Sequence, residues 1–174
     1  LVARREDELG LLRDRLQSEN SDLQIKVVNA DLTSAEAREE LIATVKEGKW
    51  APSLLVNNAG MGDYGEFVTG DWKKMEQMLS LNIIALTHLT HGLLPCMIQS
   101  GHGAVLNVSS LASLLPIPDF AVYAASKSYV TSFSEALRLE LNEHKIPVLT
   151  VCPGPVHTGF GEIAGRDGSI EESP

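Results

Sequence analysis

Cysteine is scarce in this chain of 174 residues, which contains only Cys96 and Cys152. Each lies in an apolar run, and neither belongs to the CxxC pattern of a metal or redox site. We therefore expect buried thiols in a reducing compartment and predict a cytoplasmic location. Positive charge is also in short supply. The net charge of -9 repels phosphate backbones, so no nucleic-acid partner is expected.

The sequence also lacks a long uninterrupted apolar run. The longest apolar stretch, 83–98, is broken by His88, His91, Gly92 and Pro95. It is too short and too polar for a bilayer core, so no membrane span is expected. Repeats and low-complexity segments are absent too. Hydrophobic residues make up 44% of the chain, which suits one packed domain over residues 1–174.

Helical and strand patterns alternate along the chain. The periodicity predicts helices over about 5–18, 33–46, 71–98 and 122–143. Short apolar runs predict strands at 25–28, 53–56, 104–108 and 147–151. These strand runs are continuous and do not alternate with polar residues, which is typical of strands covered on both faces. The pattern therefore predicts an α/β protein with a parallel sheet and helices on both of its faces.

Tyr123-Ala-Ala-Ser-Lys127 places a phenol and an ammonium four residues apart near the start of a predicted helix. Residues at this spacing share one helix face. A neighbouring cation and a helix N-terminus both stabilise phenolate and so lower the pKa of a tyrosine. Such a tyrosine can exchange a proton with an alcohol or carbonyl oxygen near neutral pH. Alone, the spacing is explained more simply by an ordinary aromatic residue beside an exposed lysine.

Two further polar residues are candidates for the same site. Ser110 lies 13 residues before Tyr123, at the mouth of the strand 104–108, where its hydroxyl could polarise a substrate oxygen. Taken singly, it is an ordinary turn residue. Asn82 lies among apolar residues inside a predicted helix, where an unpaired amide would be costly. Taken singly, it is a hydrogen-bonded core amide.

Five motifs follow one another in order: Asn57-Asn58-Ala59-Gly60, Asn82, Asn107-Val108-Ser109-Ser110, Tyr123 with Lys127, and Pro153-Gly154-Pro155-Val156 with Thr158. In this order and at these distances the sequence resembles the short-chain dehydrogenase/reductase family along nearly its whole length. The resemblance implies a Rossmann-type doubly wound sheet and a catalytic tetrad of Asn82, Ser110, Tyr123 and Lys127. It implies that Tyr123 is the general acid/base and that Ser110 orients the substrate oxygen. It also implies that Lys127 lowers the tyrosine pKa and binds the nicotinamide ribose, while Asn82 holds a water of the proton relay.

The resemblance further implies how the chain would bind a nicotinamide dinucleotide. Asp31 and Leu32 match positions that contact adenine. The path of the cofactor is lined by Asn58, Ala59 and Gly60, and its nicotinamide end is held by Val156 and Thr158, together with Tyr123 and Lys127. Small residues at 153–155 let the backbone approach a ligand closely.

The first five residues bear on which dinucleotide is preferred. They resemble the end of the family's second strand, where an acid would bind the ribose 2′-hydroxyl of NAD(H). This chain has Ala3 there, followed by Arg4 and Arg5, whose charge and fork geometry suit a 2′-phosphate. We therefore predict that NADP(H) is preferred over NAD(H). The alternative is that both arginines are solvated residues at the start of a helix.

Three further sequence patterns do not indicate functional sites. Gly60 to Gly65 matches GxGxxG, but no helix is predicted to open at Gly65 and no ribose-binding acid follows about 20 residues on. The sequon at Asn107 lies at a strand end in the predicted site, so no glycosylation is expected. His88 and His91 are three residues apart on a helix, but no further ligands accompany them, so no metal site is predicted.

The family's Gly-rich phosphate loop has no counterpart in this sequence. In the family, a first strand and that loop precede the position of Leu1, and a helix and a last strand follow that of Thr158. The predicted sheet therefore lacks its first and last strands, and we expect these residues to be an excerpt of a longer protein. The absent first strand would lie between the strand groups that start near residues 24 and 54.

The leading functional prediction is an NADP(H)-dependent oxidoreductase that interconverts a carbonyl and a secondary alcohol. An apolar small-molecule substrate is expected from Leu111, Leu114, Leu115, Ile117 and Phe120, which flank the predicted site. The resemblance implies a homodimer or homotetramer formed through the helices at 71–98 and 122–143. Alternatives are a non-catalytic NADP(H)-binding or scaffold protein, a chain that binds no cofactor by itself, and a sugar-nucleotide epimerase.

Overall fold

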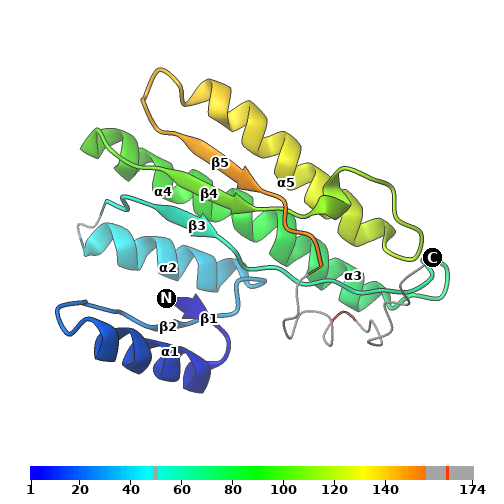
Figure 1. Ribbon diagram of the computed structural model, residues 1–174, viewed down its shortest axis with the longest axis horizontal. Helices are drawn as coiled ribbons and strands as arrows, with labels where there is room; N and C mark the ends of the chain where they lie inside the picture. The colour runs from blue at the N-terminus through cyan, green and yellow to red at the C-terminus, as the bar shows by residue number, and fades with distance from the viewer. Residues whose placement is uncertain (49–50, 156–163, 165–174) are drawn as a thin grey trace. The chain divides into compact units, whose positions relative to one another are not determined.

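The computed structural model describes residues 1–48, 51–155 and 164 (Figure 1). The chain divides into two compact units, Leu1–Trp50 and Ala51–Pro174. Each unit contains its own parallel sheet, of two and of three strands respectively. The two predicted strand groups are therefore found, and they form separate sheets. One domain over residues 1–174 remains a prediction.

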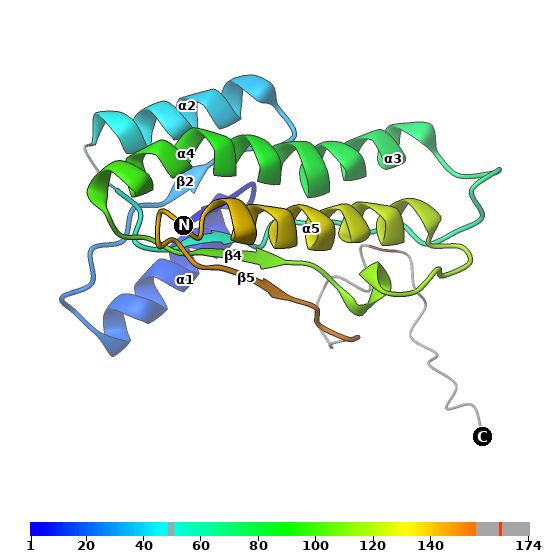
Figure 2. The same cartoon turned by 90° about the horizontal axis from the view of Figure 1, so that it is seen from above.

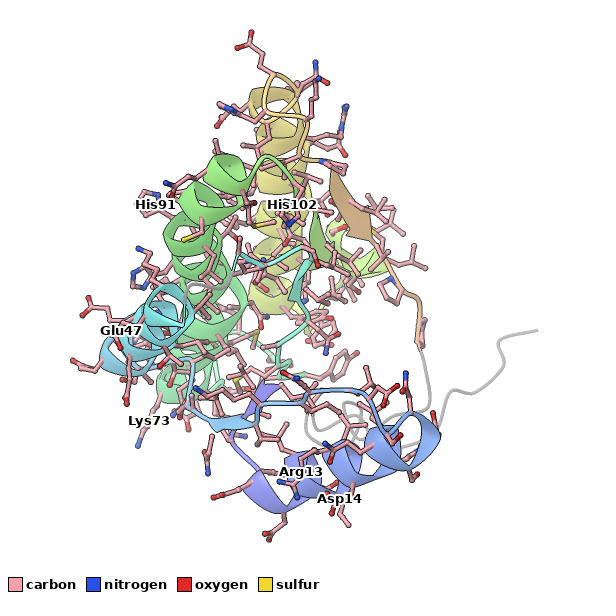
Figure 3. All side chains as sticks on the ribbon, turned by 90° about the vertical axis from the view of Figure 1, so that its left-hand side faces the viewer. Arg13, Asp14, Glu47, Lys73, His91 and His102 are labelled. Carbon is pink, nitrogen blue, oxygen red and sulfur yellow. The ribbon has the colours of Figure 1, made fainter. Side chains whose placement is uncertain are left out.

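The first unit consists of β1 (Val2–Ala3), α1 (Glu6–Glu19), β2 (Val28–Asn29) and α2 (Ala35–Glu47). Strands β1 and β2 pair in parallel, and α1 and α2 lie on opposite sides of the pair (Figure 2). Helix α2 begins where the sequence predicts, because the Ser34 side chain accepts a hydrogen bond from the Ala37 amide. On the surface of α1, Arg13 pairs with Asp14 at 2.8 Å (Figure 3).

The second unit carries the predicted catalytic residues. Its elements are β3 (Leu55–Asn57), α3 (Trp72–Leu79), a π-helical segment (Ser80–Ala85), α4 (Leu86–Ser100), β4 (Val105–Val108), a 3-10 turn (Leu111–Ser113), α5 (Ala121–Glu140) and β5 (Val148–Val151). The strands lie in the order β3-β4-β5, and each pairs in parallel with the next. Because the carboxyl ends of parallel strands meet at one edge, the loops after β3, β4 and β5 converge there.

Helices α4 and α5 lie over one face of this three-stranded sheet (Figure 2). A buried apolar cluster at that face is made of Met97, Val105, Leu137, Leu141, Ile146 and Val148. Successive strand residues point to opposite faces. On the other face Val56, Leu106 and Leu149 stand in one row, and Val56 and Leu149 are 47% and 60% exposed. The described helices of this unit thus cover one face of its sheet (Figure 2).

A buried polar network ties the sheet to its helices. The amide of Asn57 on β3 donates to Oδ1 of Asn107 on β4 at 2.8 Å and to the hydroxyl of Thr90 on α4 at 2.9 Å. The Asn107 amide in turn donates to the hydroxyl of Ser134 on α5 at 2.8 Å. Since all four residues are buried and hydrogen-bonded, the network holds β3 and β4 in register beneath α4 and α5.

The helical stretch Trp72–Ser100 runs without a break for 29 residues. Its most apolar window has a mean hydropathy of 1.4, so its length and composition alone would allow it to cross a membrane. The expectation of no membrane span was drawn from residues 83–98 alone, and with this longer helix it stays a prediction. Core helices of globular proteins pass the same test, and this helix contributes Met78, Leu93 and Met97 to the buried interior.

Candidate active site

Tyr123 and Lys127 lie in the first two turns of α5, and both are nearly inaccessible to solvent. The Nζ atom of Lys127 is 5.8 Å from the centre of the Tyr123 ring, so the predicted pairing on one helix face is found. The same Nζ donates a hydrogen bond to the main-chain oxygen of Val108, at the end of β4, at 2.9 Å. The lysine is therefore anchored to the carboxyl edge of the sheet.

Ser110 follows β4 by two residues and forms the N-cap of the 3-10 turn Leu111–Ser113. Its hydroxyl accepts a hydrogen bond from the Ala112 amide at 3.1 Å. It is also hydrogen-bonded to the Tyr123 side chain. The strand, the turn and the helix thus bring Ser110, Tyr123 and Lys127 together, although 13 residues separate the serine from the tyrosine.

Burial dominates the ionisation of both groups. It raises the pKa of Tyr123 above its usual 10.0, and the hydrogen bond from Ser110 acts the other way with a smaller effect. Burial lowers the pKa of Lys127 from 10.5 to about 8. The lowering of the tyrosine pKa expected from the cation and the helix N-terminus is therefore not found, because desolvation of the phenolate raises this pKa.

Asn82 lies in the π-helical segment between α3 and α4 and is 1% exposed. Its Oδ1 accepts from the Met61 amide at 3.0 Å, and its Nδ2 donates to the Met61 oxygen at 2.9 Å. The second Nδ2 hydrogen goes to the hydroxyl of Ser126 on α5 at 3.0 Å. The π-helical turn therefore turns the Asn82 amide towards both the loop after β3 and the helix that carries Tyr123.

The loop after β3 passes beside the lysine. Asn58, Ala59 and Gly60 are exposed there. A Cβ on Gly60 would lie 3.2 Å from Nζ of Lys127 and 3.3 Å from Oδ1 of Asn82, closer than ordinary van der Waals contact. Glycine is thus the residue that lets the loop backbone come this near to both side chains.

The predicted adenine-side and phosphate-side residues belong to the first unit. Arg4 and Arg5 are exposed, and Arg5 is the N-cap of α1. Asp31 is also exposed. Hydrogen bonds from the Thr33 amide and hydroxyl lower its carboxyl pKa, and Arg4 adds a smaller effect. Leu32 is buried, and its carbonyl accepts from the guanidinium of Arg38 at 2.7 Å. Val156 and Thr158 lie outside the described residues.

Two aromatic rings lie next to Tyr123. The Phe120 ring lies over the Tyr123 ring at 4.3 Å between centres, and Tyr64 meets Phe120 at 5.6 Å. The predicted apolar flank divides into two groups. Ile117 packs, with Phe120, against the buried cluster around Tyr123, whereas Leu111, Leu114 and Leu115 are 48%, 60% and 66% exposed.

The structure shows where the residues of three further sequence patterns lie. No helix opens at Gly65, and α3 begins only at Trp72. Asn107 is fully buried and therefore out of reach of glycosylation. His91 is exposed on α4 (Figure 3), and the described part of the chain holds no cluster of three or more potential metal ligands. Cys96 and Cys152 are free but only half-buried, not fully buried as predicted.

Sequence reasoning missed three contributors to this site. Ser126 contacts Asn82, and Met61 supplies the backbone groups that Asn82 binds. Ser109 is 3% exposed, and its hydroxyl donates to the Lys127 carbonyl at 2.9 Å, which holds α5 against the end of β4. Ser109 and Ser126 lie inside the sequence motifs named above. The sequence does not distinguish them from other serines, because their hydrogen-bond partners come close only in the folded protein.

Comparison with known proteins bears on the family to which this chain belongs. A sequence profile described as short chain dehydrogenase matches residues 1–167. The chain belongs to the short chain dehydrogenase family. Within that family, 134 residues are 38% identical to the uncharacterized oxidoreductase YbbO of Escherichia coli strain K12, covering 75% of this chain and 49% of YbbO. Sulfoacetaldehyde reductase of Chromohalobacter salexigens is 32% identical over 165 residues, which cover 92% of this chain and 63% of the reductase.

Solved structures of family members match the fold as well. A short-chain dehydrogenase from Sphingobium yanoikuyae in complex with NADPH superposes with a TM-score of 0.91 at 33% identity, covering 99% of this chain and 67% of that protein. The bulky-bulky ketone specific alcohol dehydrogenase of Comamonas testosteroni gives a TM-score of 0.83 at 31% identity, with 90% and 61% covered. The predicted Rossmann-type fold is confirmed. The chain spans 49% of the length of YbbO and 63% of the length of the sulfoacetaldehyde reductase.

Proposed function

We propose that this chain carries the proton-transfer site of an NADP(H)-dependent oxidoreductase that interconverts a carbonyl and a secondary alcohol. The observation that carries the proposal is the convergence of Ser110, Tyr123 and Lys127 at the carboxyl edge of the sheet. A hydrogen-bonded phenol beside a buried cation is suited to exchanging a proton with a substrate oxygen. The names of several relatives, reductases and dehydrogenases, support the same reaction class.

The residues of the site take separate roles in this reaction. The nicotinamide, when bound, supplies or accepts the hydride at the substrate carbon. Tyr123 Oη gives a proton to the carbonyl oxygen in reduction and takes it back in oxidation. Ser110, already hydrogen-bonded to Tyr123, orients that oxygen and stabilises its developing charge. Lys127 keeps a positive charge beside the phenol and favours the phenolate that remains once the proton has left.

The described residues fit a dinucleotide's nicotinamide ribose. The Lys127 ammonium has three N–H donors. Within the described ranges, one of them donates a hydrogen bond to the main-chain oxygen of Val108. The other two can meet the vicinal hydroxyls of a ribose. Gly60 has no side chain, so the loop backbone passes close to Lys127 without placing a Cβ against its Nζ atom. NADP(H)-bound relatives such as the Sphingobium dehydrogenase support this cofactor for the present chain.

Preference for NADP(H) over NAD(H) is proposed from Arg4 and Arg5. Both side chains are exposed and carry charge that suits a 2′-phosphate. Asp31 and Leu32 are proposed to contact the adenine, and Val156 and Thr158 the carboxamide. Comparing kcat/KM for NADPH and NADH in the full-length protein tests the preference, and an equal or higher value for NADH would overturn it.

The substrate is proposed to be apolar next to its carbonyl. Tyr64 and Phe120 continue an aromatic surface from the Tyr123 ring, while Leu111, Leu114 and Leu115 present exposed apolar side chains from the loop after β4. Apolar contact area of this kind binds hydrocarbon groups better than charged ones. A panel of ketones and aldehydes with NADPH should favour aryl and alkyl ketones over charged 2-oxo acids.

A homodimer or homotetramer is proposed for the full-length protein. Helices α4 and α5 and the π-helical segment carry exposed apolar side chains that include Ile84, Tyr129 and Leu139. The Tyr129 ring stacks on Phe133, and its hydroxyl lies 3.0 Å from the hydroxyl of Thr87. These contacts fix the orientation of the Tyr129 ring within the exposed apolar surface. Light scattering of the purified protein tests this, and a monomer at micromolar concentration would contradict it.

The alternative function is a non-catalytic NADP(H)-binding protein. Such a protein would have the same fold but would not need a proton donor. The buried Tyr123 and its Ser110 hydrogen bond favour the enzyme, because a binding module gains nothing from them. The deciding experiment is turnover of the carbonyl panel by the full-length protein with NADPH. Oxidation of NADPH that depends on a carbonyl substrate supports the enzyme, and NADPH binding without turnover of any member supports the scaffold.

A further inference from the structure

Ser126 lies on α5 between Tyr123 and Lys127 and has no solvent-exposed surface. Its hydroxyl accepts a hydrogen bond from Nδ2 of Asn82 at 3.0 Å and donates one to the main-chain oxygen of Tyr123 at 2.7 Å. The hydroxyl is therefore paired both as donor and as acceptor, and the two partners come from the π-helical segment and from the catalytic helix.

The amide of Asn82 depends on this serine. Its Nδ2 has two hydrogens, of which one goes to the Met61 oxygen and the other to Ser126. Its Oδ1 accepts from the Met61 amide. Both donors of the amide are consequently occupied by protein atoms, and a continuous chain of hydrogen bonds runs from the loop backbone at Met61 through Asn82 and Ser126 to the Tyr123 carbonyl.

We propose that Ser126 is a positioning residue that acts through Asn82. Ser126 fixes the orientation of the Asn82 amide. The amide in turn holds the loop of Gly60 and Met61 beside Lys127 and aligns this loop with the first turn of α5. Removing the hydroxyl leaves a buried Nδ2 hydrogen unpaired, and the amide then turns to find another acceptor. The loop loses its anchor as a result. The inference rests on the proposed oxidoreductase function and adds a residue that touches neither substrate nor dinucleotide.

Ser134 offers a matched control on the same helix. It is 1% exposed, accepts from the amide of Asn107 at 2.8 Å and donates to the Val130 carbonyl at 2.6 Å. Ser126 and Ser134 thus make the same pair of bonds, to an asparagine amide and to a carbonyl of the preceding turn. Asn82 belongs to the predicted catalytic tetrad, whereas Asn107 does not. A purely structural role for Ser126 therefore predicts similar effects from both replacements, and a positioning role predicts a larger effect on turnover from Ser126→Ala.

The first measurement is steady-state kinetics of the full-length protein. Ser126→Ala is expected to lower kcat on the order of tenfold, whereas Ser134→Ala changes kcat by less than about twofold although both lose stability. Adding Ser126→Ala to Asn82→Ala is expected to cost less than about twofold more, because the serine acts through the amide already removed. Fully additive losses, or equal losses of kcat in the two serine variants, would overturn the proposal.

A second measurement does not depend on turnover. The Met61 amide hydrogen is held by Asn82 Oδ1, so its exchange with deuterium should be faster in Ser126→Ala than in Ser134→Ala under conditions where both are folded. Equal exchange in the two variants contradicts the proposal even if the enzyme is active. Faster exchange in a protein that turns over no carbonyl keeps the positioning role and refutes the oxidoreductase instead. If Ser126→Ala does not fold, Ser126→Cys paired with Ser134→Cys carries the same comparison.

Discussion

Lys127 donates an Nζ hydrogen to the main-chain oxygen of Val108 at 2.9 Å, so the ammonium of α5 is held at the end of β4. A neutral carbonyl satisfies one hydrogen bond but does not offset the loss of water around a buried cation. Burial accordingly lowers the pKa of the lysine to about 8. The position proposed to serve catalysis and ribose binding therefore costs the fold stability while the lysine is charged.

The stability of the folded chain should rise between about pH 8 and pH 10. Unfolded Lys127 keeps its proton up to about 10.5, while folded Lys127 begins to lose it near 8, so the unfolded state binds more protons in between and ΔG of unfolding increases with pH. The gain is on the order of 2–3 kcal/mol. Above about pH 10 the raised pKa of Tyr123 opposes it, because unfolded tyrosine ionises first.

Urea denaturation at a series of pH values measures this rise. The variant Lys127→Met should be flat over the same interval, and Lys73→Met, which removes an exposed lysine from α3, should retain the rise. A Lys127→Met protein with the same pH dependence as the wild type would contradict the assignment.

Replacing Tyr123 with Phe should abolish turnover and leave NADPH binding intact. The change removes only the hydroxyl proposed to transfer the proton, and the Phe ring keeps the stacking on Phe120. A fall in kcat of at least about a thousandfold, with Kd for NADPH within about threefold by fluorescence titration, is expected. Substantial residual turnover would rule out the role proposed for the tyrosine.

Gly60→Ala should reduce activity more than it reduces stability. The added methyl would press on Nζ of Lys127 at 3.2 Å and on Oδ1 of Asn82 at 3.3 Å, so one of them must shift. We expect kcat/KM to fall on the order of tenfold. The control Gly10→Ala lies on α1, where nothing comes within 4 Å of the new Cβ, and should stabilise the chain by roughly 0.5–1 kcal/mol without loss of activity.

Asn57→Ala should destabilise the protein by roughly 2–3 kcal/mol, because it leaves the Asn107 oxygen without its donor inside the sheet. The exposed neighbour Asn58→Ala should change stability by less than about 0.5 kcal/mol. Denaturant midpoints of the two variants separate a structural role from a cofactor role for these adjacent residues. Equal midpoints would mean that the buried network contributes little.

Much of the local structure was predictable. The N-cap at Ser34, the start of α3 after Asp71 and the helix bearing Tyr123 all follow from capping residues and apolar periodicity. The strands were found but are shorter than predicted, since an apolar run continues past the residues that form ladder hydrogen bonds. The segments that pack on each strand were not predictable, because a run of apolar residues does not identify the part of the chain that covers it.

The sequence by itself determined the order of the elements, the family and the residue types available for proton transfer, because helix and strand periodicity and motif spacing are local properties. Only the tertiary structure decided which of those residues contact one another and how their pKa values change. Lys127 meets Val108, and Asn82 meets Met61 and Ser126, across 19, 21 and 44 residues of chain. Burial, which raises the pKa of Tyr123, also exists only once distant segments have packed around the ring.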